Sequence, residues 1–235
     1  MKTLLQDLLA HTYTLGFIST LKMTNTTVES VSDDMTIILT VNIKDKIKDF
    51  NGTFGMGSLN KLDYLLKCPE YKDNGKINVI YDKNKIPISL SFENNNGDFK
   101  NVYRFMNETI INSKLKRPNY KEPHWDISFK PELNAIQRMK YQIQCNNDEK
   151  TFQVYTENNN LIFKFGNDAL HSGSFIFHEN VNILLKKHSW SIPQIISILN
   201  LTGNINMNIS DAGVLKIDVN SGFANYEFLI PAQRK

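Results

Sequence analysis

The stretch KINVIYDKNKIPISLSFENNNGDFKNVYRFM, residues 76–106, carries the pattern from which the fold of the whole chain can be predicted. It alternates apolar and polar residues in three runs, at 76–81, 86–92 and 99–106, with Asp, Asn, Lys and Gly in the turns between them. Alternation with a period of two predicts half-buried antiparallel strands. Just before it, residues 58–67 place four leucines on one side of a predicted helix, with Ser58 as a candidate N-cap. The local unit is therefore one helix followed by three strands.

This unit recurs along the chain. Leucines at helical spacing open the sequence, and β-rich runs follow at 17–23 and 35–43. The clearest amphipathic helix spans residues 131–144, where Pro131 suits the first helical position, and a shorter helix is predicted at 192–200. The strands predicted for the second half are 151–156, 161–165, 172–178, 204–209, 214–219 and 225–230. Four copies of one unit, two in each half, predict a pseudo-symmetric α+β fold.

The halves are joined by a stretch of different composition. Residues 107–125 contain Pro118 and Pro123 and few apolar side chains, which indicates an exposed connector. We therefore expect an N-terminal domain at 1–110, a connector at 111–125 and a C-terminal domain at 126–235. A basic cluster lies in or beside the connector: Lys114, Lys116, Arg117 and Lys121.

Composition excludes several classes of protein. The chain has 235 residues, 41% of them hydrophobic, which is enough for a sizeable core, and its net charge of +3 is too small to identify a nucleic-acid binder. The two cysteines, Cys68 and Cys145, have no CxxC partner, so a disulfide framework and a cysteine zinc site are not expected. Gln6 and Asp7 interrupt the apolar start, and no run reaches the roughly 20 residues of a membrane span. We expect a reducing, intracellular setting and no membrane partner.

No catalytic set is recognisable. None of the five histidines pairs with another at a helical i, i+4 spacing, and no nucleophile elbow occurs. The glycine-rich residues 52–57 match neither GxGxxG nor a phosphate-binding P-loop. They are better interpreted as close-packed backbone or a bulged strand leading into a helix. We expect no enzyme activity, no metal and no cofactor.

The outer faces of two helices offer a different chemistry. A stripe of Leu133, Ile136, Met139 and Ile143 would leave a polar face opposite, and so would the leucines of 58–67. These faces carry Asn134, Arg138 and Tyr141, flanked by Lys140, on one helix, and Asn60, Lys61, Tyr64 and Lys67 on the other. Amides, tyrosines and cations contact phosphate oxygens without reading sequence. The alternative interpretation is an ordinary solvated surface of a Lys- and Asn-rich protein.

Two segments strengthen the first interpretation. The run DFNGTFGMGSL at 49–59 and ANY at 224–226, together with the length and the order of the repeats, resemble the DNA sliding clamps of T-even-type tailed bacteriophages. The resemblance implies three chains closed head to tail into a ring, with helices lining the hole and sheets pairing across subunit boundaries. It also implies duplex DNA threaded through the ring, a DNA polymerase held by its C-terminal peptide, an ATP-driven clamp loader and a location in the host cytoplasm.

On this interpretation we expect one set of residues to face DNA: Lys2, Asn60, Lys61, Tyr64, Lys67, Lys130, Asn134, Arg138, Lys140, Tyr141, Lys186 and Lys187. Two helices depart from the pattern. The helix at 192–200 has no basic residue, so Lys186 and Lys187 before it would substitute, and the first helix has only Lys2 and carries Asp7. The alternatives are a non-enzymatic β-rich phage structural or adaptor protein and an enzyme with a dispersed site.

Overall fold

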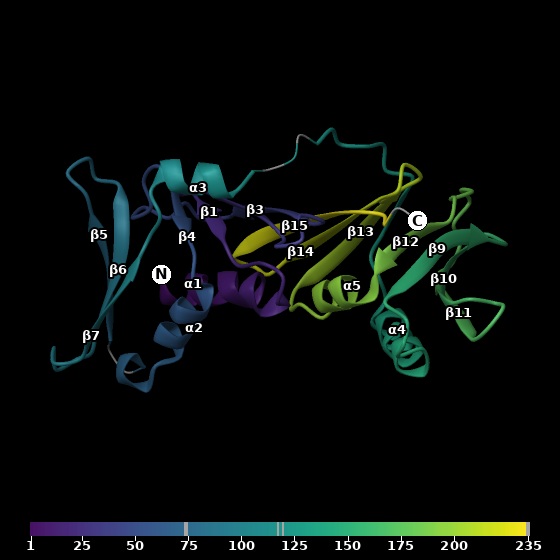
Figure 1. The fold of residues 1–235 in the computed structure, drawn as a ribbon, viewed down its shortest axis with the longest axis horizontal. Coiled ribbons are helices and arrows are strands. Elements are labelled where there is room, and N and C mark those ends of the chain that lie inside the picture. The colour runs from purple at the N-terminus through teal and green to yellow at the C-terminus, as the bar shows by residue number, and fades with distance from the viewer. Residues whose placement is uncertain (73–74, 117, 119, 234–235) are drawn as a thin grey trace. The chain divides into compact units, whose positions relative to one another are not determined.

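The structure is a computed structural model that describes residues 1–72, 75–116, 118 and 120–233 (Figure 1). Its α-helices are α1 (Lys2–Ala10), α2 (Leu59–Lys67), α3 (Glu108–Lys114), α4 (Leu133–Cys145) and α5 (Ile192–Leu199), and its 3₁₀ turns are η1 (Tyr13–Leu15) and η2 (Pro69–Tyr71). Its strands are β1 (Leu21–Met23), β2 (Thr27–Val31), β3 (Ile38–Ile43), β4 (Phe54–Met56), β5 (Lys76–Tyr81), β6 (Pro87–Glu93), β7 (Lys100–Arg104), β8 (Ile127–Phe129), β9 (Thr151–Glu157), β10 (Asn160–Gly166), β11 (Ser172–His178), β12 (His188–Ser191), β13 (Asn204–Ser210), β14 (Val214–Asn220) and β15 (Ala224–Pro231).

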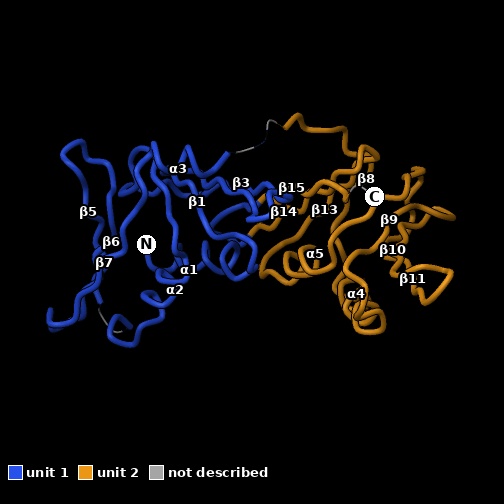
Figure 2. The backbone as a smooth tube through the Cα atoms, in the orientation of Figure 1, with its two compact units in different colours: residues 1–119, 221–226 blue, residues 120–220, 227–235 orange. Residues whose placement is uncertain are grey.

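The chain folds into two compact units (Figure 2). The first contains Met1–Asn119 with Ser221–Tyr226, and the second contains Tyr120–Asn220 with Glu227–Lys235. Each unit holds two copies of the helix-plus-three-strand repeat, so the predicted α+β repeat is confirmed. Strand β15 is divided between the units at Tyr226.

In the first unit, antiparallel strands run in the order β4-β1-β2-β3-β15, and β5-β6-β7 form a second sheet. Helices α1 and α2 lie side by side, away from α3 (Figure 1). The apolar stripes of α1 and α2 fill the core, with Leu5, Leu9, Leu62 and Leu66 no more than 3% exposed. Amphipathic spacing thus positions both helices with their polar faces outward.

In the second unit, the orders are β15-β14-β13-β8 and β11-β10-β9-β12. Strands β9, β10 and β14 alternate buried and half-exposed residues along most of their length, as period-two patterning requires. The core is aromatic: the rings of Phe163 and Phe177 stack with centroids 4.0 Å apart, and Trp190 is fully buried. Helices α4 and α5 lie side by side (Figure 1).

Some local expectations were wrong or incomplete. Pro131 is not the first helical residue, because α4 begins at Leu133 with Glu132 as its N-cap. Leu133 is 86% exposed, and Ala135 takes its place on the buried side with Ile136 and Met139. Strand β2 was not predicted, and short strands β4, β8 and β12 precede the helices of three repeats.

Ser58 holds the N-cap position of α2 without capping it. Its backbone is left-handed, with φ of 52° and ψ of 48°, and its side chain makes no capping hydrogen bond. A side-chain cap normally requires extended backbone at this position, which explains the lost contact.

The predicted connector is not exposed throughout. Its first part forms helix α3, which buries one side chain. Helix α3 begins after Asn107, whose side chain accepts a 2.9 Å hydrogen bond from the Ile110 N–H, and Ile111 is fully buried. A Cβ added at Gly55 would lie 2.7 Å from the Cβ of Ile111. The glycine-rich segment is therefore close-packed backbone leading into a helix, as predicted. Arg117 of the basic cluster lies outside the described residues.

Candidate nucleic-acid interface

Helix α2 presents the polar face expected from its sequence. Asn60, Lys61, Tyr64 and Lys67 are all exposed, and the Tyr64 side chain is 71% exposed. The Lys67 ammonium forms a 2.7 Å ion pair with Asp63, one turn earlier. This partner balances the charge of Lys67, whereas Lys61 has no ion pair within the described part of the chain.

Helix α4 presents Asn134, Arg138 and Tyr141, which are exposed, while Lys140 is half-buried. Arg138 does not extend freely into solvent. Its Nη1 donates to the carbonyl of Ile176 over 3.4 Å, and its guanidinium lies 5.2 Å from the centre of the Phe175 ring. Both contacts are on β11, so Arg138 is held against the edge of its sheet.

The remaining predicted cations have varied surroundings. Lys2 is half-buried and donates a 2.9 Å hydrogen bond to the carbonyl of Tyr71, whereas Lys130 is exposed after β8. Lys186 forms a 2.8 Å ion pair with Asp211, and this hydrogen bond lowers the pKa of the Asp211 carboxyl. The Lys187 ammonium lies 4.8 Å from the ring centre of Tyr155. Lys186 and Lys187 are thus held by the β13–β14 turn and by β9, not by α5.

Asp7 is less of an obstacle than its sequence position suggests. Its side chain is 12% exposed and accepts hydrogen bonds from Ser221 (2.8 Å) and Tyr226 (2.7 Å). Its negative charge is therefore directed into the first unit, and the outer face of α1 is close to neutral.

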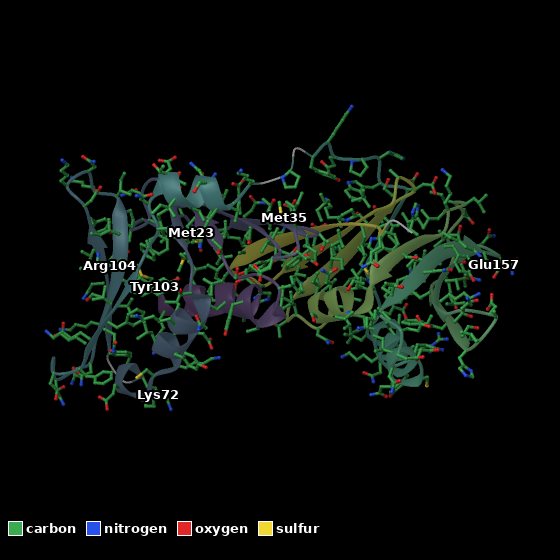
Figure 3. The ribbon with its side chains drawn as sticks, in the orientation of Figure 1. Met23, Met35, Lys72, Tyr103, Arg104 and Glu157 are labelled. Carbon is green, nitrogen blue, oxygen red and sulfur yellow. The ribbon has the colours of Figure 1, made fainter. Side chains whose placement is uncertain are left out.

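One group of cations was not predicted as a group, although Lys61 and Lys114 were each noted separately in the sequence. Lys61, Arg104 and Lys114, from α2, β7 and α3, line a single hollow of about 460 Å³ in the first unit. Figure 3 marks Arg104 beside Tyr103 on β7. No local sequence pattern could predict this grouping, because only the packing of three separate elements places the residues around one hollow.

A hollow of about 270 Å³ beside α4 bears on the enzyme alternative. It is lined by Glu132, Arg138, His178 and Glu179 among others. Within the described residues no ion pair or hydrogen bond joins His178 to either acid, and its ring instead stacks on Phe129 with centroids 4.3 Å apart. The hollow thus shows no contact between a base and an orienting acid.

Metal binding and membrane spanning find no support in residues 1–72, 75–116, 118 and 120–233. In those ranges no three His, Cys, Asp or Glu side chains gather as metal ligands. Of the helices described there, none is both long and apolar enough to cross a bilayer.

The repeats and the sheet orders match the PCNA-like clamp fold. A structure described as the C-terminal region of FEN-1 bound to A. fulgidus PCNA matches with a TM-score of 0.65, covering 100% of this chain and 95% of that chain at 12% identity. The PCNA2–PCNA3 complex of Sulfolobus tokodaii matches with a TM-score of 0.62, covering 99% and 97% at 12% identity. No protein-family model matches the sequence, and no curated protein is significantly similar to it. At 12% sequence identity, the likeness to these structures establishes the fold alone.

Proposed function

We propose that this chain is a DNA sliding clamp of a T-even-type tailed phage, which encircles duplex DNA and tethers the replicative DNA polymerase. The observation that carries the proposal is the clamp fold, matched over the whole chain and built from four helix-plus-three-strand repeats. In such a protein the clamp itself performs no chemistry, and retention on DNA is topological.

The helix faces fit weak, non-specific DNA contact. B-DNA carries about one negative charge per 1.7 Å of axis, so a few cations in each subunit suffice when symmetry repeats them. Asn60, Lys61 and Tyr64 on α2 and Asn134 and Tyr141 on α4 offer interchangeable hydrogen bonds to phosphate oxygens. A tighter grip would oppose sliding, so the modest net charge of +3 suits this role.

Ring closure requires a free strand edge on each side of the subunit. Strand β7 lies at one edge of its sheet and β11 at one edge of its own. The chain after β7 is anchored, because Met106 and Gly55 exchange two 2.8 Å backbone hydrogen bonds. We propose that β7 of one copy pairs with β11 of the next, which closes a head-to-tail homotrimer.

The partners follow from the same proposal. The C-terminal region of FEN-1 is bound to PCNA in one structural neighbour, which makes a polymerase C-terminal peptide a suitable partner for this chain. A ring closed around DNA also needs a clamp loader that opens it with ATP.

The decisive experiment measures mass and topology together. Light scattering should give three times the 27.1 kDa mass of the chain. Loaded onto nicked circular DNA by its cognate loader and ATP, the protein should stay bound in high salt and dissociate when the circle is linearised. A monomer at micromolar concentration, or retention that does not respond to linearisation, would contradict the proposal.

A further inference from the structure

The first unit contains a concentration of positive charge in which Lys61, one of the expected DNA-facing residues, lies with two cations outside that set. Lys61 on α2, Arg104 on β7 and Lys114 at the end of α3 line one hollow of about 460 Å³. Arg104 and Lys114 are exposed, and none of the three cations has an ion pair within the described residues. The chain as a whole balances 27 Lys and Arg against 24 Asp and Glu, so three uncompensated cations in one hollow are a local excess.

Acidic groups do not cancel this charge. In the part of the chain that the structure describes, no Asp or Glu lines the hollow. Asp33 lines two other hollows that share Ser19 with this one. Ser19 donates a 2.5 Å hydrogen bond to Asp33, so this carboxylate already has a partner.

Polar groups that suit an oxyanion complete the lining. Ser19 and Ser58 both line the hollow, and because the Ser19 hydroxyl donates to Asp33, Ser58 is the serine of the two that can donate to a ligand. Ser58 makes no capping hydrogen bond to α2, which leaves its hydroxyl available to a ligand at the start of that helix. A helix N-terminus carries partial positive charge, which adds to the field of the three cations.

We propose that this hollow binds a phosphate group. Arg104 presents the planar, bidentate donor that matches phosphate geometry, and Lys61 and Lys114 add point charges from other elements. Three cations suit a ligand with two negative charges better than they suit a carboxylate, which has one. The volume is many times the roughly 30 Å³ of a water molecule, so a diphosphate or a phosphate that still carries its sugar fits. The phosphate comes either from a nucleic-acid backbone or from a free phosphate compound.

The site lies within one unit and does not rest on ring formation. It can therefore fail while the clamp function stands, and the clamp function can fail while the site stands. Lys114 is the best position to test, because it lies outside both the expected DNA-facing residues and β7.

The first experiment is calorimetric titration of the full chain with inorganic pyrophosphate at constant ionic strength. Saturable binding is expected, with affinity reduced at least tenfold in Lys114→Gln and in Arg104→Gln. Lys83→Gln, in the exposed β5–β6 turn, is the matched control and should bind like the wild type. Light scattering of each variant separates a change in assembly from loss of the site.

A second measurement identifies the source of the phosphate. If the ligand is nucleic acid, pyrophosphate competes with a short duplex in fluorescence anisotropy. Lys114→Gln then weakens duplex binding, and the slope of log affinity against log salt concentration falls in magnitude by about one. If the ligand is a free compound, pyrophosphate binds and duplex affinity is unchanged by Lys114→Gln. Absence of saturable binding of both probes, or equal losses in Lys114→Gln and Lys83→Gln, would overturn the proposal.

Discussion

The phenol of Tyr226 donates a 2.7 Å hydrogen bond to the carboxylate of Asp7, which lies 219 residues earlier in the sequence. Ser221 donates to the same oxygen over 2.8 Å, and the His11 ring stacks on Tyr226 with centroids 4.6 Å apart. Burial, and then the neighbouring Asp7, raise the pKa of the Tyr226 phenol well above its usual value. This cluster fastens the first helix to the start of the last strand within the first unit.

Tyr226→Phe should therefore destabilise the protein. The substitution removes one of the two hydroxyls that donate to a nearly buried carboxylate, and loss of a hydrogen bond to such a group costs about 1–3 kcal/mol. Urea denaturation measures the loss. Tyr81→Phe is the control, because Tyr81 is exposed and its phenol is 3.4 Å from Asp49. Equal effects of the two substitutions would contradict a structural role for the Tyr226–Asp7 contact.

Two neighbouring glycines should respond differently to alanine. At Gly55 a Cβ would lie 2.7 Å from the branched Cβ of Ile111, whereas at Gly57 it would lie 2.9 Å from the flexible end of Met106. Gly55→Ala should destabilise the protein by about 1–3 kcal/mol through overpacking of α3 on β4. Gly57→Ala should have a much smaller effect. Thermal unfolding of both variants decides the point, and a larger loss at Gly57 would show that the packing has been misjudged.

Much of the fold could be predicted where local pattern and packing agree. Strands β5 and β11 were predicted to the residue, because period-two runs are bounded there by turn residues. Strand β2 was missed because a polar residue holds a core position: Ser30 is fully buried and donates a 2.6 Å hydrogen bond to the Thr20 carbonyl. A pattern of apolar residues cannot reveal such a buried hydroxyl.

The candidate site was predictable only in part. Helical periodicity correctly predicted the exposed residues of α2, because exposure there depends on the helix alone. Contacts between distant segments were outside its reach: Lys2 bonds to Tyr71, 69 residues away, and Arg138 bonds to Ile176, 38 residues away. The hollow lined by Lys61, Arg104 and Lys114 has the same origin, because tertiary packing alone brings its elements together.

Asp218 should make stability fall as pH rises. Burial, with repulsion from Glu227, raises the pKa of its carboxyl despite Lys216 at 3.8 Å. The folded chain then holds this proton at a pH where the unfolded chain, with a pKa of about 3.9, has lost it. The favourable contribution is present below the unfolded pKa and is lost as pH rises through the folded one. The gain in unfolding free energy of Asp218→Asn over the wild type should therefore increase from pH 4.5 to pH 7.

Asp168→Asn is the matched control for this measurement, because the pKa of Asp168 is shifted in the opposite direction from that of Asp218. A hydrogen bond from Lys164 lowers the pKa of Asp168, so its contribution is present above the unfolded pKa and is lost as pH falls through the folded one. Urea titrations at both pH values should show that the unfolding free energies of the two variants, each relative to the wild type, diverge as pH rises. Parallel curves would refute the assignment of the pH effect to Asp218.

Asp63→Asn should strengthen DNA binding. Asp63 holds Lys67 in the 2.7 Å ion pair, and its removal frees one cation on the outer face of α2. Exposed ion pairs are worth about 0.2–1 kcal/mol, so affinity for a short duplex should rise by roughly 1.4- to 5-fold. Asp45→Asn removes an exposed acid outside α2 and controls for net charge. If Asp45→Asn raises affinity as much in fluorescence anisotropy, the effect is one of total charge and the face of α2 is not the contact.

Val102→Pro should separate the subunits of the proposed head-to-tail trimer without unfolding them. Phe105 donates its N–H to Ile88 of β6, and because N–H groups alternate along a strand, the N–H of Val102 points away from β6. Proline is tolerated at such an edge position, but it removes the donor that a strand added by another copy would use. Light scattering should then show a monomer while circular dichroism stays close to that of the wild type. Val102→Thr keeps the donor and the branched side chain, so it should assemble normally. An unchanged trimer in Val102→Pro would mean that β7 is not the strand that closes the ring.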